Sequence, residues 1–263
     1  MLTVDCLSKS FGGVKAVDGC SFAVEPGRIT ALIGPNGAGK TTVFQCISGF
    51  LAPDAGRVAL GDRDVTNLAP WERARAGMSR TFQQVRLWPY LTVEEHLLLA
   101  LHRGDDRITA VFAGDTRPRG AAMRATLERV GLPIGLLDRL GSDLSYGQSK
   151  LLEIARALSF PHTLLLLDEP VAGVHPVLRQ QIADILRGLR RDGETILVIE
   201  HDMDFVRSVA DHVIVMAEGK VLLEGAPEEV LRNPEVMEAY LGVATLNGEA
   251  RMTNEIRRHK FEG

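Results

Sequence analysis

The 263-residue chain has few cysteines, few aromatic residues and no excess of positive charge. Three cysteines without CxxC spacing exclude a disulfide framework and suit a reducing compartment. The 30 basic and 34 acidic residues leave a net charge of −4, which argues against a general nucleic-acid binder. No apolar run approaches the roughly 18 residues that span a bilayer, and the N-terminus lacks the pattern of a signal peptide.

Glycine is what the chain has in excess. Its 26 glycines amount to about one residue in ten, against an average near 7 %. Hydrophobic residues at 45 % and charged residues at 24 % are typical of globular proteins, so the bulk of the chain is not disordered. The length suits one large domain or two small ones.

Apolar runs alternate with helical patterns along most of the chain, which predicts an α/β fold with a helical insertion. Continuous apolar runs such as 164–167 are typical of strands buried on both faces of a parallel sheet. The predicted strands are 2–6, 20–24, 29–33, 57–60, 164–167, 195–199, 212–216 and 220–224. The predicted helices are 39–48, 70–76, 92–101, 119–130, 145–159, 176–192 and 203–210, with one or two short ones in 227–241. We expect a mobile loop at 103–118 and a frayed tail at 245–263.

The strongest motif lies between an apolar strand and a helix. Residues 34–41, Gly-Pro-Asn-Gly-Ala-Gly-Lys-Thr, match the phosphate-binding pattern G-x-x-x-x-G-K-[ST] in full. Glycines let backbone N–H groups approach phosphate oxygens, and the helix dipole adds positive potential. The pattern places Lys40 on the β- and γ-phosphates and the Thr41 hydroxyl on Mg²⁺, although a glycine-rich turn is the simpler alternative. The predicted nucleotide-binding residues here are Asn36, Gly37, Gly39, Lys40, Thr41 and Thr42.

A second motif ends the apolar run 164–167 in two adjacent carboxylates, Asp168 and Glu169, followed by Pro170. Asp168, at the C-terminal end of the strand, can hold Mg²⁺, usually through water, and Glu169 can then polarise an attacking water. By itself the pair could equally cap the next turn. Beside a phosphate-binding loop, it indicates a catalytic site.

A third motif, Leu144-Ser-Tyr-Gly-Gln148, precedes the predicted helix 145–159. Ser145 is a favourable N-cap residue, and Gly147 leaves backbone N–H groups open to an anion. Taken alone, the segment is a simple helix cap. It lies 105 residues after Lys40 and 23 residues before Asp168.

These motifs in this order, with the isolated His201 after the run 195–199, resemble the ATP-binding subunits of ABC transporters over residues 2–243. The resemblance implies a P-loop NTPase fold with a RecA-like parallel sheet core, an antiparallel β subdomain and a helical insertion. It implies one nucleotide-binding domain over 1–244, with the helical subdomain at about 88–160 and a flexible tail at 245–263. In that family two subunits face head to tail, so that Ser145, Gly147 and Gln148 bind the γ-phosphate held by the partner's Lys40.

Further residues match family positions one at a time. Phe11 stands where the family stacks an aromatic ring on adenine, the alternative being a core residue that ends the first strand. Gln83 fits the glutamine that senses Mg²⁺ and the attacking water. Gln84 could hold this position instead if the match is shifted by one residue, and Gln83 could also be an ordinary surface glutamine. His201 fits the histidine that contacts the γ-phosphate. The implied catalytic residues are Lys40, Gln83, Glu169 and His201, and the implied metal ligands are Thr41, Gln83 and Asp168.

One position departs from the family pattern. His175 stands where the family has Asp or Asn, in a loop that crosses to the partner's site. An imidazole can make a hydrogen bond but cannot replace a carboxylate. The departure leaves Glu169 intact and is compatible with a heterodimer of unequal sites.

Within the family, the segments Arg80–Gln83, 91–94, 144–148, 199–203, 233–236 and 239–242 resemble the ATPases of branched-chain (hydrophobic) amino-acid uptake. The resemblance implies an ATPase that uses ATP and Mg²⁺ as a peripheral subunit on the cytoplasmic face of the inner membrane. The implied partners are permease subunits, a second ATP-binding subunit (identical or homologous) and, indirectly, a substrate-binding protein. The alternatives are urea or amide uptake, lipopolysaccharide export, a soluble non-transport ABC ATPase and a non-hydrolysing docking subunit.

Overall fold

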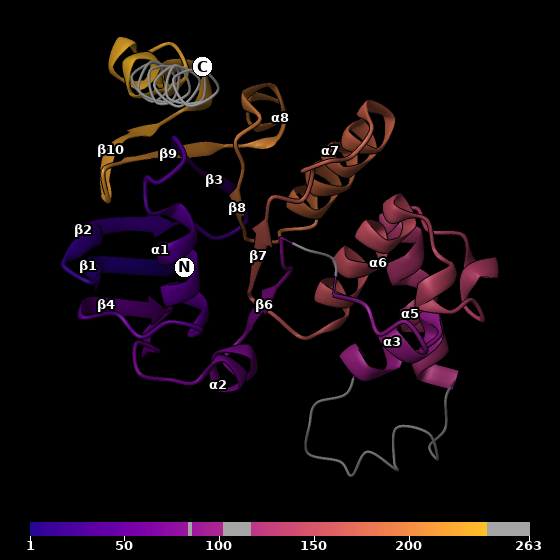
Figure 1. Ribbon diagram of the computed structural model, residues 1–263. Helices are drawn as coiled ribbons and strands as arrows, with labels where there is room; N and C mark the ends of the chain where they lie inside the picture. The colour runs from indigo at the N-terminus through magenta and orange to yellow at the C-terminus, as the bar shows by residue number, and fades with distance from the viewer. Residues whose placement is uncertain (84–85, 102–116, 241–263) are drawn as a thin grey trace, which may run out of the picture.

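Two sheets and a group of helices make up the computed structural model, which describes residues 1–83, 86–101 and 117–240, without the side chains of 117–119 (Figure 1). The larger sheet has six strands in the order β10-β9-β3-β8-β7-β6, and the smaller has four antiparallel strands in the order β2-β1-β4-β5. The strands are β1 (Leu2–Phe11), β2 (Val14–Val24), β3 (Ile29–Ile33), β4 (Ala55–Leu60), β5 (Arg63–Asp64), β6 (Met78–Arg80), β7 (Leu164–Asp168), β8 (Ile196–Ile199), β9 (His212–Ala217) and β10 (Lys220–Gly225).

The α-helices surround these sheets and form the insertion between β6 and β7. They are α1 (Lys40–Ser48), α2 (Pro70–Arg75), α3 (Val93–Leu101), α5 (Arg117–Val130), α6 (Tyr146–Ser159), α7 (Pro176–Arg191), α8 (Met203–Val209) and α9 (Pro227–Val230). Residues 234–240 are also helical. In Figure 1 the insertion helices α3, α5 and α6 lie on the opposite side of β6 and β7 from α1, β1 and β2.

The larger sheet is buried on both faces. Its strands β6, β7, β8, β3 and β9 are parallel, and β10 joins β9 in antiparallel fashion. Successive side chains of a strand point to opposite faces. In β7, Leu165 and Leu167 therefore pack in a cluster with the insertion helices, α7 and α8, whereas Leu164 and Leu166 pack in a cluster with α1, β1 and β2. This double covering explains the continuous apolar runs and confirms the predicted α/β class.

The helix that follows the glycine-rich loop is held at both ends. Gly49 ends α1 with a φ of 80°. The buried Arg73 of α2 donates to the carbonyls of Cys46 and Ile47, the last turn of α1, and to those of Thr66 and Leu68. A cation at the C-terminal end of a helix complements the helix dipole. Arg73 thereby fixes α1 against the loop that precedes α2.

The structure differs from the sequence-based prediction at several boundaries. Both hairpin strands are longer than expected: β1 continues to Phe11, and β2 begins at Val14. The short strands β5 and β6 were not predicted, because two or three residues carry no periodicity and form strands only by pairing with a neighbour. Helix α5 begins at Arg117, inside the predicted loop 103–118. The rest of that loop up to 116 and the predicted tail 245–263 lie outside the described residues.

Within the described ranges, no helix is long and apolar enough to cross a membrane.

Candidate functional site

The glycine-rich loop, residues 34–39, joins the end of β3 to the start of α1 and depends on two glycines for its packing. Gly34 has a φ of 148°, and an added Cβ would lie 2.2 Å from the carbonyl oxygen of Met216 in β9. Gly39 has a φ of 97°, and an added Cβ would lie 2.3 Å from the carbonyl oxygen of Ala16 in β2. A side chain at either position would push the loop away from the sheets. Both glycines therefore set the shape of the loop.

The start of α1 is suited to binding an anion. Its N-cap is Gly39, which supplies no capping side chain, and the first turn contains no acidic residue. Backbone N–H groups at a helix N-terminus attract anions when nothing else satisfies them. Asn36, Gly37 and Thr41 are exposed on this loop and helix start, and Thr42 is half-buried.

Lys40 lies under the loop, with 8 % of the residue exposed. Its Nζ donates to the carbonyl oxygens of Gly34, at 2.7 Å, and Pro35, at 2.9 Å. Burial lowers the pKa of Lys40, and the charge of Glu169 opposes that effect. A phosphate in the loop would meet both the ammonium group and the N–H groups of α1.

Asp168 ends β7 as a nearly buried carboxylate. Its Oδ2 lies 2.8 Å from Nη2 of Arg80, the last residue of β6, and its backbone N–H donates to the Thr81 hydroxyl. Burial raises the pKa of Asp168, and the charge of Arg80 works in the opposite direction. Thr41, Gln83 and Asp168 line one cavity of about 230 Å³, which we call the Asp168 cavity.

Three of the predicted catalytic side chains meet just beyond β7. Gln83 Nε2 donates to Glu169 Oε2 at 2.9 Å, and His201 Nδ1 lies 4.0 Å from Glu169 Oε1. Glu169 has a φ of +48°, a conformation that non-glycine residues rarely adopt and that is often associated with functional sites. The register alternative, Gln84, lies outside the described residues.

The third motif, residues 144–148, leads into the start of α6. Ser145 is the N-cap: its Oγ accepts from the Gln148 backbone N–H at 3.2 Å, and its own N–H donates to Gln148 Oε1 at 2.9 Å. This reciprocal capping box fixes the first turn. Gly147 lies beside α7, where an added Cβ would be 2.9 Å from Leu178 Cδ2. In the described part of the chain, no hydrogen bond or ion pair joins Ser145, Gly147 or Gln148 to residues 34–41.

Phe11 ends β1 at the tip of the β1–β2 hairpin. Half of the residue is exposed, at 50 %, and Lys9 Nζ lies 5.8 Å from its ring centroid. The alternative of a core phenylalanine is therefore wrong. The tight Gly12-Gly13 turn, with φ values of 52° and 88°, leaves the ring free to stack on a planar ligand.

His175 is the N-cap of α7. Its Nδ1 accepts from the Val177 backbone N–H at 3.4 Å. The imidazole therefore takes over, with a long bond, the capping role that an Asp or Asn side chain would perform at this position.

Sequence reasoning missed three charged residues that contact the site, two of them buried and the third, Arg80, nearly so. Glu200 has no exposed surface, and its carboxylate accepts from the N–H groups of Val171 and His201. Lys150 of α6 donates to the carbonyl oxygen of Gln83 at 3.1 Å. The third is Arg80. Each lies beside a recognised motif, but burial is what distinguishes them, and a local pattern does not reveal it.

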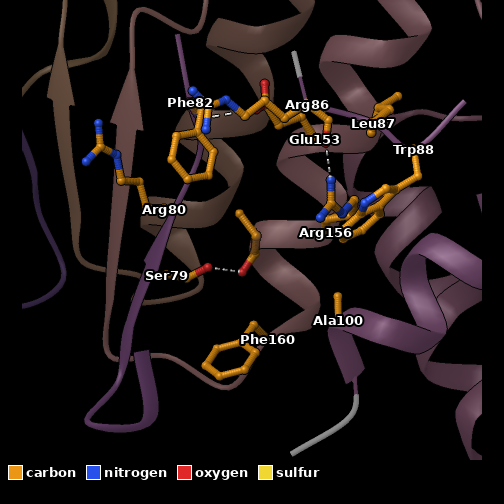
Figure 2. A pocket seen from close by; sticks show the side chains of 11 residues that line it. Ser79, Arg80, Phe82, Arg86, Leu87, Trp88, Ala100, Glu153, Arg156 and Phe160 are labelled. Atoms are coloured by element: carbon orange, nitrogen blue, oxygen red, sulfur yellow. Dashed lines mark hydrogen bonds between the residues drawn. The ribbon is translucent and has the colours of Figure 1, made fainter. Parts of the chain in front are cut away.

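A groove separates the edge of the larger sheet from the helical insertion (Figure 2). It encloses about 630 Å³, and its lining residues include Phe82, Arg86, Trp88, Arg156 and Phe160. The guanidinium group of Arg156 lies over the Trp88 ring, 4.8 Å from its centroid, and donates to the carbonyl oxygen of Arg86. The groove therefore combines aromatic walls with three cationic side chains, those of Arg80, Arg86 and Arg156, and the carboxylate of Glu153.

Comparison with known proteins gives two family matches, one over the N-terminal and central part of the chain and one near its C-terminal end. The ABC transporter family matches residues 17–172, and the family described as branched-chain amino acid ATP-binding cassette transporter matches residues 220–245. The high-affinity branched-chain amino acid transport ATP-binding protein LivG of Escherichia coli (strain K12) is 41 % identical over 254 residues, covering 93 % of this chain and 98 % of LivG. BraF of Pseudomonas aeruginosa, which carries the same description, is 40 % identical over 252 residues with the same coverage.

Solved structures agree with the sequence comparisons. The crystal structure of the ADP conformation of an ATP-binding cassette of an ABC transporter has a TM-score of 0.81 and 37 % identity, covering 92 % of this chain and 98 % of that chain. A nucleotide-free cassette structure has a TM-score of 0.79 at the same identity. The chain therefore belongs to the ABC transporter family, as one of its ATP-hydrolysing ATP-binding cassettes.

Proposed function

We propose that this chain powers the uptake of branched-chain or other hydrophobic amino acids by hydrolysing ATP for partner permeases. One observation carries the hydrolytic part: Gln83 and His201 converge on Glu169 at the end of β7. The class of transported molecule is supported by the printed descriptions of LivG and BraF and by the family match at residues 220–245.

The triphosphate is held by the loop and by α1. Backbone N–H groups at Gly37 and Gly39 and the ammonium group of Lys40 contact its oxygens, and Asn36 and Thr42 complete the cradle. Phe11 offers its exposed ring to the adenine. Charge that develops on the γ-phosphate during hydrolysis is stabilised by Lys40 from one side.

Thr41, Gln83 and Asp168 fit a Mg²⁺ ion that accompanies ATP. Their side chains carry hydroxyl, amide and carboxylate oxygens and line the same Asp168 cavity, and hard oxygen donors are the ligands that Mg²⁺ prefers. Bound there, the ion would neutralise charge on the β- and γ-phosphate oxygens.

Glu169 orients or deprotonates the attacking water. Gln83 holds one carboxylate oxygen in place, and His201 approaches the other. Glu200, which accepts from the His201 N–H, keeps the histidine segment at the end of β8. Water activation by a positioned carboxylate contributes about 10²–10⁴ to the rate.

A second cassette supplies Ser145, Gly147 and Gln148 to the γ-phosphate. Among the described residues, no hydrogen bond or ion pair joins these three to residues 34–41 of the same chain, which supports this arrangement. The capping box uses the Ser145 oxygen as an acceptor for Gln148 N–H, which leaves its hydroxyl proton available to a phosphate.

The groove of Figure 2 receives a short helix of a permease subunit, which holds the chain at the cytoplasmic face of the membrane. Its aromatic walls suit the apolar side of such a helix, and Arg86 and Arg156 suit an acidic residue on it. Through the permeases, the chain is linked to a substrate-binding protein.

An uptake measurement tests the proposal. We expect deletion of the gene from its host to abolish high-affinity uptake of labelled leucine, isoleucine and valine. The wild-type gene restores uptake, and the Lys40→Ala variant, expressed at the same level, does not. Unchanged leucine uptake together with lost urea or amide uptake would overturn the amino-acid assignment and leave the ATPase assignment standing.

A further inference from the structure

Arg80 is a largely enclosed cation beside the proposed metal site. It ends β6, where it pairs in parallel register with Leu166, two residues before the end of β7. The following N–H, that of Thr81, donates to the Leu166 carbonyl oxygen at 2.9 Å. This register brings the guanidinium group to Asp168, with 2.8 Å between Nη2 and Oδ2. Only 11 % of the Arg80 side chain and 7 % of the Asp168 side chain are exposed.

Aromatic rings surround the same guanidinium group. Its central carbon lies 4.8 Å from the ring centroid of Phe44, 5.3 Å from that of Phe50 and 5.2 Å from that of Phe82. Nη1 donates to the hydroxyl of Ser48, which lies in the last turn of α1. In Figure 2 the guanidinium group points away from Trp88 and Arg156 across the groove. Residues from three segments, 44–50, Phe82 and Asp168, therefore surround the guanidinium group.

This geometry divides the two oxygens of Asp168. Oδ2 is engaged by Arg80, whereas Oδ1 accepts no hydrogen bond from any residue that the structure describes. Arg80 and Asp168 both line the Asp168 cavity with Thr41 and Gln83. A carboxylate held through one oxygen keeps the other available to a ligand in that cavity.

We propose that Arg80 is a positioning residue that orients Asp168, by holding its Oδ2, so that Oδ1 serves the nucleotide-bound Mg²⁺. The inference rests on the metal role of Asp168 given under the proposed function. It does not require Arg80 to touch the nucleotide. It also explains why an arginine stands here: its planar fork bonds Asp168 and Ser48 at once while stacking on aromatic rings, and a lysine cannot reproduce all three contacts.

The test measures ADP affinity of the intact chain, by calorimetry, in Mg²⁺ and in EDTA. The variants are Arg80→Lys and Arg80→Met. Loss of a residue that orients a metal ligand costs about 10–100-fold in metal affinity. Mg²⁺ raises the ADP affinity of the wild type by some factor. In both variants we expect that factor to be at least about tenfold smaller, with the ADP affinity in EDTA unchanged. Ser48→Ala, which keeps both charges, should shift the Mg²⁺ gain in the same direction and covers the case in which an Arg80 variant fails to fold.

Three results would overturn the inference. They are an unchanged Mg²⁺ gain in all variants, a full Mg²⁺ gain in Arg80→Lys with loss in Arg80→Met, and an equal drop in affinity with and without Mg²⁺. The second would show that charge alone suffices, and the third that Arg80 merely supports the fold. Asp168→Asn is the reference: if it keeps the wild-type Mg²⁺ gain, the metal role of Asp168 fails, and with it the proposed function of the cavity rather than the role of Arg80 alone.

Discussion

Replacing Glu169 by glutamine separates catalysis from nucleotide binding. The two side chains have the same shape, and both meet the same backbone cost at a φ of +48°. The amide oxygen of the new side chain can still accept from Gln83 Nε2, which lies 2.9 Å from the carboxylate in the wild type. Because no buried contact is lost, we expect the free energy of unfolding to change by less than about 0.5 kcal/mol.

Catalysis should respond much more strongly. An amide cannot take a proton from water, so the variant loses the general base and keeps only an acceptor for orienting the water. A positioned base contributes about 10²–10⁴-fold, which corresponds to about 2.7–5.4 kcal/mol of activation free energy at 1.36 kcal/mol per tenfold. Lys40 and the N–H groups of α1 remain in place, so ATP affinity should stay within about twofold of wild type.

The assay is phosphate release by the purified chain at saturating ATP, with ATP affinity measured in parallel by a fluorescent nucleotide. Gln83→Ala is the matched control, because it removes the donor to Glu169 and keeps the carboxylate. We expect it to lower turnover by less than Glu169→Gln does. Turnover of Glu169→Gln within threefold of wild type would refute the role of Glu169. A parallel loss of ATP affinity would show that the residue binds nucleotide instead.

Three further predictions concern stability. Gly39→Ala should lower the free energy of unfolding by about 2–6 kcal/mol, since strain at a φ of 97° adds to a clash with a carbonyl oxygen of β2. Urea denaturation measures this loss. Gly12→Ala is the control, because nothing lies within 4 Å of a Cβ added there, and a loss for Gly39→Ala no larger than for Gly12→Ala would contradict the prediction. Burial alone would lower the pKa of His162, but the contact of its Nε2 with Glu194, at 3.1 Å, and the bond to the Phe160 carbonyl oxygen raise it overall. While Glu194 is ionised, the stability from that pair is therefore complete below about pH 6.5 and declines as pH rises through the raised pKa of His162. His162→Gln should remove this part of the decline between pH 6 and 9, and parallel wild-type and variant profiles would argue against it. Finally, His175→Asp should stabilise the chain by about 0.5–1 kcal/mol, because Asp is a better N-cap and α7 has no acidic residue in its first turn; an unchanged or lower melting temperature would count against the capping role.

Contiguous motifs were predictable because neighbours in sequence make their chemistry. The glycine pattern at 34–39 needs only a strand before it and a helix after it, and both were predicted close to their observed bounds. The capping box of Ser145 and Gln148 is likewise complete within four residues. The contact of Gln83 with Glu169 spans 86 residues and was not predicted; only the presence of Gln83 at this site was expected, through the family resemblance.

Strand β6 shows where local reasoning fails. Its three residues, Met78, Ser79 and Arg80, have no strand periodicity of their own and are held by pairing with β7. Without that strand, Arg80 is one charged residue in a motif. With it, Arg80 becomes a buried partner of Asp168.

The sequence by itself determined the chemistry at the C-terminal ends of β3 and β7: a loop for phosphates after β3 and a pair of carboxylates at the end of β7. It did so because glycines, a lysine and acidic residues at fixed spacing act through the local backbone. Tertiary structure alone decided which side chains share a cavity, which of the two Asp168 oxygens is engaged, and that Lys150, Glu200 and Arg80 are buried supports. Those properties depend on strand order and register in the larger sheet, which join residues far apart in the chain.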